Sequence, residues 1–123
     1  MSYVDGFVMS VPKKNLKAYM TMAKKAGEVW LDCGALEYFE CVGDDLNVKM
    51  GTPFTRLLKL KRGETAVFSW IVFKSRVARD RINAKVMKDK RMAKMMDPKK
   101  MPFDIKRLSY GGFKTMVERC AWE

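Results

Sequence analysis

The sequence predicts an α+β fold of the ferredoxin-like sandwich type, in which helices cover one face of a four-stranded antiparallel sheet. Strand and helix patterns follow one another in the order βαββαβ, the order of two split βαβ units. The chain has 123 residues, so residues 1–123 are assigned to a single domain. The third strand is apolar on both faces, which predicts that two such sheets pair as a dimeric α/β barrel.

Composition and periodicity locate each element in turn. Strands are predicted where β-branched and aromatic residues cluster, and helices where apolar residues recur every three or four positions. Asn15 or Ser10 is placed to cap the first helix, and Gly34 suits the left-handed turn after it. The predicted strands are Tyr3–Ser10, Ala35–Val42, Thr65–Phe73 and part of Lys106–Arg119, with Phe54–Leu60 a candidate for a short additional strand; the predicted helices are Leu16–Cys33, Ser75–Val86 and Asp89–Met96.

The strand Thr65–Phe73 carries the strongest signal in the chain. Five of its side chains face one way, and four face the other: Thr65, Val67, Ser69, Ile71 and Phe73 against Ala66, Phe68, Trp70 and Val72. A half-exposed strand would carry polar residues on one of these faces. Since the few helices of this chain can cover one face only, we expect a second copy of the sheet to cover the other.

The second half of the chain has clear helix-capping and turn signals. Ser75 caps the second helix, and Asp89 caps a short helix that Asp97-Pro98 ends. The paired glycines Gly111-Gly112 interrupt the last strand, which predicts a bulge or a close approach of another group to the backbone.

The composition is that of a basic protein, with 25 Lys and Arg against 14 Asp and Glu and a net charge of +11. This excess of positive charge raises the question whether the protein binds nucleic acid. The basic residues are scattered along the chain, and such a distribution favours solubility over a single binding patch. No apolar run approaches the roughly 18 residues of a membrane span, and no signal peptide is recognised. Three cysteines without a C-x-x-C pattern suit a reducing compartment, so a cytoplasmic location without membrane association is expected.

The chain contains no histidine, which excludes the Ser-His-Asp and Cys-His nucleophile arrangements and the commonest zinc ligand. Cys33, Cys41 and Cys120 are too dispersed for a thiolate metal site. The sequence contains neither of two glycine-rich phosphate-binding patterns, G-x-x-x-x-G-K-[ST] and G-x-G-x-x-G. No metal and no cofactor are therefore predicted.

Several stretches distributed over the chain resemble the YbaA-like family of uncharacterised bacterial proteins. They are Tyr3-Val4-Asp5-Gly6-Phe7, Gly34-Ala35-Leu36-Glu37-Tyr38, Glu40-Cys41-Val42-Gly43-Asp44-Asp45, Phe68-Ser69-Trp70-Ile71, Ser75-Arg76 with Arg79-Asp80, Pro102-Phe103-Asp104 and Tyr110-Gly111-Gly112-Phe113. Leu108 stands where this family is expected to have methionine. The resemblance implies a dimeric α/β-barrel fold and a homodimer, and it implies no activity. Related barrels include cofactor-free monooxygenases and small-molecule binders, a link of fold analogy alone.

The most suggestive polar group is Ser75, Arg76, Arg79 and Asp80, at the start of the second helix. Two guanidinium groups within one turn can clamp a carboxylate or phosphate, which would make Arg76, Arg79 and Asp80 ligand-binding residues for an anion. The alternative, which we favour, is an ion-pair network that ties this helix to the acidic end of the second strand at Glu40, Asp44 and Asp45.

Asp5 and Glu40 are candidate catalytic residues, because each is an acid within a strand otherwise rich in apolar residues. A carboxylate buried on a barrel-facing surface can act as a general base. The alternative is a structural pairing with an arginine such as Arg107. Aromatic residues are candidates for a ligand pocket or for plain packing: Trp30, Tyr38, Phe68, Trp70 and Tyr110.

Three functions remain open. The favoured one is a homodimeric domain that binds a small molecule, or acts on it without a cofactor, at a site in the barrel interior or at its rim. The second is binding of RNA or other nucleic acid, which the sequence Glu64-Thr65-Ala66-Val67 after Arg62-Gly63 disfavours because the aromatic residues of the RNA-recognition pattern are missing. The third is a structural or regulatory dimer without a small ligand.

Overall fold

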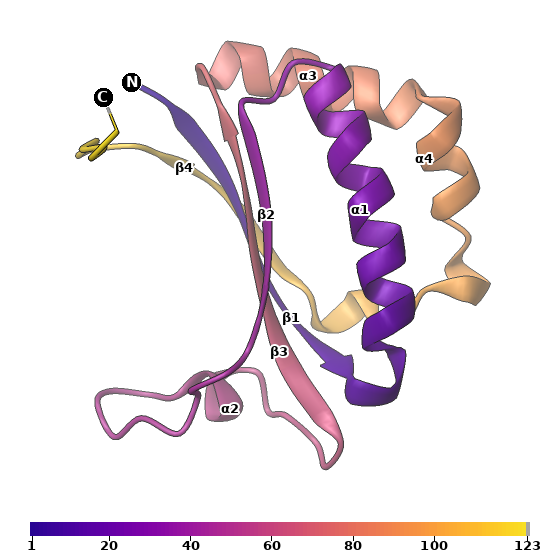
Figure 1. Ribbon diagram of the computed structural model, residues 1–123, viewed down its shortest axis with the longest axis vertical. Helices are drawn as coiled ribbons and strands as arrows, with labels where there is room; N and C mark the ends of the chain where they lie inside the picture. Colours follow the sequence, from indigo (N-terminus) through magenta and orange to yellow (C-terminus); the bar gives the residue numbers. More distant parts are fainter. Residues whose placement is uncertain (123) are drawn as a thin grey trace.

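The computed structural model describes residues 1–122, and its sheet has the predicted ferredoxin-like topology. The strands lie in the order β2-β3-β1-β4, and every neighbouring pair is antiparallel. The elements are β1 (Tyr3–Pro12), α1 (Leu16–Asp32), β2 (Glu37–Val42), α2 (Phe54–Leu57), β3 (Glu64–Phe73), α3 (Arg76–Lys88), α4 (Lys90–Met95) and β4 (Ser109–Lys114), with single 3₁₀ turns at Lys13–Asn15, Pro98–Lys100 and Ile105–Arg107. Helices α1, α3 and α4 all lie on one side of the sheet (Figure 1).

The two faces of β3 differ in the way that its alternating sequence predicts. The five side chains from Thr65 to Phe73 at odd positions are buried against the helices, where Ile71 and Phe73 join the main core. On the other face Phe68 keeps 45% of its surface exposed. We call this second face, which α1, α3 and α4 leave uncovered, the open face of the sheet.

The helix boundaries follow the predicted caps. The Ser75 side chain accepts a hydrogen bond from the backbone N–H of Ala78, and the Asp89 side chain accepts one from Arg91. After α1, Gly34 has φ +119, a conformation that a side chain rarely adopts. These residues end one element and begin the next without a long loop, so that α1 and α3 both return onto the sheet.

Two predictions about the first helix and the β2–β3 connection are wrong. Asn15 precedes α1 but donates its side-chain N–H to the carbonyl of Pro102, and Ser10 lies within β1. The segment Phe54–Leu60 is not a strand, because its first turn is the short helix α2, in which Arg56 and Leu57 donate to the carbonyl of Pro53. The ring of Phe54 then meets Phe68 edge to face, so this connection covers one end of the open face.

The paired glycines of β4 do not form a bulge. Gly111 and Gly112 pair with Gly6 and Asp5 in an unbroken register. A Cβ atom at Gly112 would lie 2.5 Å from the guanidinium of Arg79 and from the hydroxyl of Tyr3. The second predicted explanation, close approach to the backbone, is therefore the correct one.

Within residues 1–122, no helix has both the length and the apolar composition needed to cross a bilayer.

Candidate functional site

A carboxylate held by two tyrosine hydroxyls is the central polar feature beneath the helices. Glu40 lies on the helix-covered face of β2, and its Oε1 accepts a 2.7 Å hydrogen bond from Tyr19 of α1. Its Oε2 accepts a 2.6 Å hydrogen bond from Tyr38, two residues earlier on the same face of β2. Burial, and then the charge of Glu40, raise the pKa of both Tyr19 and Tyr38 well above the usual range. Both phenols therefore stay protonated and donate to Glu40.

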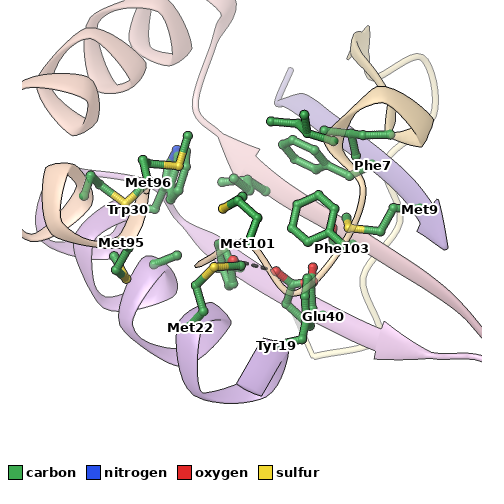
Figure 2. A pocket seen from close by; sticks show the side chains of 17 residues that line it. Phe7, Met9, Tyr19, Met22, Trp30, Glu40, Met95, Met96, Met101 and Phe103 are labelled. Carbon is green, nitrogen blue, oxygen red and sulfur yellow. Dashed lines mark hydrogen bonds between the residues drawn. The ribbon is translucent and has the colours of Figure 1, made fainter. Parts of the chain in front are cut away.

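This cluster lines a cavity of about 150 Å³ between the sheet and the helices. In Figure 2 Glu40 and Tyr19 lie at one side of the cavity, with Phe103 and Met101 beside them. β1, β2 and β3 form its floor, α1 forms one wall, and α4 with the chain that follows it lines a further side, so that the cavity is partly open to the surface. An apolar cavity with a few convergent polar groups is the usual form of a small-molecule site.

Methionines supply much of the cavity wall. Six of them surround it: Met9, Met22, Met92, Met95, Met96 and Met101. The aromatic residues of the wall are Phe7, Tyr19, Trp30, Tyr38 and Phe103. Methionine is flexible and polarizable, so a wall of this kind can adapt its shape to more than one occupant.

Asp5 belongs to a second, separate polar cluster. Its side chain is 1% exposed and accepts a 2.9 Å hydrogen bond from Nε of Arg79 and a 3.1 Å hydrogen bond from Nδ2 of Asn83. Asn83 in turn accepts a hydrogen bond from the indole N–H of Trp30. Asp5 thus has the two things that a buried charge needs, an oppositely charged partner and hydrogen-bond donors, since one of its two donors belongs to a guanidinium. This arrangement ties α3 to β1.

The start of α3 is thus the ion-pair network that the sequence favoured, with different partners. Arg79 binds Asp5 of β1 and, at 2.8 Å, Asp80, instead of the predicted acids near the end of β2. Its remaining amino group lies 3.4 Å from the hydroxyl of Tyr110. The hydrogen bonds to Asp80 and Asp5 raise the pKa of Arg79 further above its usual range. With its donors directed at these groups, Arg79 is poorly placed to clamp an anion.

Arg76 adds little to this cluster. Its guanidinium lies 3.8 Å from Asp80, and both side chains are more than half exposed. Exposed pairs of this kind contribute about 0–1 kcal/mol to stability. Arg107, the other predicted partner of the strand carboxylates, instead pairs with Glu64 at 2.6 Å.

The sequence-predicted site residues therefore occupy three places. Glu40 lines the cavity, together with Trp30 and Tyr38. Asp5, Arg79, Asp80 and Tyr110 form the network around α3, and β3 separates β1 from β2, so Asp5 and Glu40 do not share a site. Trp70 lies on the open face, where its ring stacks on Phe39 at 5.0 Å between centroids. The cavity lies under the helices of one protomer, whereas the sequence analysis expected a site in the barrel interior or at its rim.

Sequence reasoning missed Tyr19 and Asn83 as site residues. Tyr19 lies on the apolar stripe of α1, together with Ala23 and Ala26, and all three residues are buried. A phenol on the buried stripe of a helix generally finds a polar partner, and this signal could have linked Tyr19 to an acid on the sheet. Asn83 lies next to Ile82 on α3 and had no comparable signal.

The fold and the comparisons define the class of protein. Solved structures share the ferredoxin-like fold at low identity: a dimeric ferredoxin-like protein from an uncultured marine organism (TM-score 0.61, 7% identity, 98% of this chain and 99% of that one) and Rv0793 from Mycobacterium tuberculosis (TM-score 0.59, 9% identity, 98% and 100%). A nipsnap family protein with unknown function from Agrobacterium tumefaciens is also similar, with a TM-score of 0.57, 14% identity, and coverage of 93% of this chain and 87% of that one.

The sequence comparisons then give the family. Residues 2–105 match the family described as "Protein of unknown function (DUF1428)", and the chain belongs to that family. It is 42% identical over 118 residues to the uncharacterised protein YbaA of Escherichia coli (strain K12), covering 96% of this chain and 99% of YbaA. YbaA of Shigella flexneri matches to the same extent. The resemblance to YbaA-like proteins is confirmed.

Proposed function

We propose that this protein is a cytoplasmic homodimer that binds a small, largely apolar molecule in the cavity of each protomer. The cavity carries this proposal, because it combines about 150 Å³ of space with an apolar wall and one carboxylate held in place by two tyrosines. An empty apolar cavity of similar volume, about 150 Å³, binds benzene in another protein, so a single six-membered ring is a suitable size.

Binding, as opposed to cofactor-independent catalysis, is the form of this function that the geometry favours. Glu40 can accept a hydrogen bond or a proton from a ligand. A catalytic site also needs further polar groups at the reacting atom, and apart from the Glu40 cluster the described cavity wall offers only the hydroxyl of Ser69 and an indole N–H already bonded to Asn83.

The open face supports the homodimer. Phe39, Phe68 and Phe113 lie on this face and are 46%, 45% and 63% exposed. Several exposed aromatic groups on one face of a sheet are typical of an interface. The marine ferredoxin-like protein with the same fold is described as dimeric, which is consistent with pairing through this face.

Nucleic-acid binding through the sheet is less well supported. Exposed aromatic side chains on a four-stranded sheet can stack on bases, and Phe39 and Phe68 have that placement, with the half-buried Trp70 beside them. Binding also requires cations along the backbone of the nucleic acid. The open-face positions of β1–β4 in the described chain carry no Lys or Arg, so the phosphates would find no partner there.

Ligand-detected NMR with a panel of one-ring compounds tests the cavity proposal. Wild-type protein and an Ala26→Leu variant are compared, because Ala26 lines the cavity and a larger side chain fills it. Ala84→Leu, at an exposed position of α3, is the matched control. We expect binding to wild type and to Ala84→Leu, and weaker binding to Ala26→Leu. No binding of any compound to the wild type would support a structural or regulatory dimer instead.

A further inference from the structure

The cluster of Glu40, Tyr19 and Tyr38 offers hydrogen-bond acceptors and no free O–H of its own, and Ser69, opposite Glu40 on β3, carries the remaining side-chain hydroxyl of the described cavity wall. Tyr19 and Tyr38 each have a single O–H, and both direct it to Glu40. The carboxylate of Glu40 has lone pairs only. A ligand group that reaches this cluster must therefore bring its own donor hydrogens.

No ion pair joins Glu40 to a Lys or Arg of residues 1–122, although Lys24 shares a surface groove with Glu40 and Tyr38. Among the described residues that line the cavity, Glu40 is the only Asp or Glu, and there is no Lys or Arg. This is unusual in a chain with 25 basic residues, whose other interior strand carboxylate, Asp5, has its own arginine. Glu40 is half-buried, and its two hydroxyl donors are neutral, so its negative charge lacks the Coulombic attraction that a cation would add.

The wall around Glu40 is suited to an organic cation. Aromatic faces attract a cation within about 6 Å of the ring. Trp30 and Tyr38, whose ring centroids are 6.0 Å apart, line the cavity on the α1 side, and Phe7 and Phe103 line it elsewhere. The remainder of the wall is thioether and hydrocarbon, which suits an apolar body attached to the charged group.

Basic residues are found outside the cavity, at its edge. Met22 and Met95 line both the cavity and a surface groove that also carries Lys25, Lys94 and Lys100. An anionic ligand would find its positive partners in this groove and would meet Glu40 if it moved further in. The groove with Lys25, Lys94 and Lys100 therefore suits an anion, and the cavity beside Glu40 suits a cation.

We infer that the cavity selects a protonated amine attached to a small apolar or aromatic body, with the ammonium group bound to Glu40. This inference rests on the proposed function and specifies its ligand class. The ammonium supplies both the missing donors and the missing positive charge, and the ring occupies the space between Trp30, Phe103 and the methionines (Figure 2).

Four compounds with the same ring test this inference: benzylamine, benzyl alcohol, toluene and benzoate, at neutral pH. Binding is followed by NMR of ¹³C-methyl-labelled methionine, in which Met92, Met95 and Met101 report on the cavity. Met50 and Met116 are internal controls, since both are more than 80% exposed. We expect benzylamine to bind at least about tenfold more tightly than toluene, the ratio expected for one charge-assisted hydrogen bond, and more tightly than benzyl alcohol, whose hydroxyl brings a donor but no positive charge.

Glu40→Gln removes the charge and keeps the shape of the side chain. We expect this variant to lose the preference for benzylamine and to keep its affinity for toluene, whereas Asp45→Asn, which makes the same change of net charge on an exposed loop, should keep the preference. The wild-type series is decisive even if Glu40→Gln does not fold. Equal binding of all four compounds, or tighter binding of benzoate, would overturn the amine inference and leave the proposed function standing. Binding of none of them would overturn both.

Discussion

Replacing Phe68 by alanine should weaken the proposed dimer strongly, and the size of the effect follows from its exposure. An aromatic side chain has about 200 Å² of surface, and Phe68 leaves 45% of its surface accessible in the single chain. Covering this remaining area, about 90 Å², at about 25 cal/mol per Å² stabilises each protomer by about 2 kcal/mol. The dimer contains two such rings, so their joint contribution is about 4–5 kcal/mol.

Alanine retains part of this contact, so we expect the dissociation constant to rise by about 100- to 1000-fold. Sedimentation velocity over a dilution series measures it. Met87→Ala is the control, because Met87 is 59% exposed on α3, on the other side of the sheet. Its dissociation constant should equal that of the wild type.

A second variant separates association from folding. Phe68 also contacts Phe54 and Trp70 within its own chain, so alanine there weakens the protomer as well. Phe113→Ala, on β4, removes a ring that is 63% exposed and should weaken the dimer with less effect on urea unfolding of the protomer. If Phe68→Ala and Phe113→Ala both dimerise like the wild type, or if the wild type is a monomer at all concentrations, the open face is not the interface.

Three further predictions concern the polar clusters. Arg79→Met leaves Asp5 buried without its cation and should lower the free energy of unfolding by about 3–5 kcal/mol in urea titrations, with recovery on adding Asp5→Asn; an unchanged midpoint in the single variant would contradict this. The pKa of Tyr38 is raised in the folded state, so the stability that its protonated hydroxyl contributes is present below about pH 10 and is lost as the pH rises further. Tyr38→Phe should therefore lose less stability at alkaline pH than the wild type. Parallel curves of unfolding free energy against pH would refute the raised pKa of Tyr38. The hydrogen bonds from Arg91 lower the pKa of Asp89 from 3.8 to about 2, so this carboxylate stabilises the fold above pH 4 and loses that effect as the pH falls towards 2. The difference in urea midpoint between the wild type and Asp89→Asn should shrink over that interval. A constant difference would mean that the charge of Asp89 contributes nothing to stability.

Local patterns were sufficient to predict the sheet. The alternation in β3 places Ile71 and Phe73 on one face and Phe68 and Trp70 on the other, and the structure buries the first pair and leaves Phe68 half exposed. A side-chain period of two is a property of the strand itself, so it does not depend on what the strand packs against. The same holds for Ser75, whose capping role needs only the residues that follow it.

Partners that lie far apart in the sequence could not be predicted in the same way. The ion-pair network of Arg79 was recognised as a class, but its main partner is Asp5 and not an acid at the end of β2. The choice depends on strand order, because β1 lies beside β3 on the side towards β4, and α3 begins directly after β3. Gly112 belongs to the same arrangement, since Arg79 and Tyr3 occupy the space that a side chain at that position would need.

The cavity is harder still to predict, because it is defined by space that side chains leave empty. Tyr38 and Glu40 share a face of β2 by their spacing alone, so their proximity is readable from the sequence. The second donor, Tyr19, reaches Glu40 only because α1 docks across β2 with that side chain towards the sheet, a rotation that the helical period does not determine. Methionine at positions such as Met92 and Met101 is equally compatible with a filled core and with an adaptable wall. Glu40 can bind an ammonium group only if the space beside it admits a ligand; otherwise it serves as a structural hydrogen-bond acceptor for the two tyrosines. Binding of benzylamine, benzyl alcohol, toluene and benzoate to the wild type and to Glu40→Gln distinguishes these two roles.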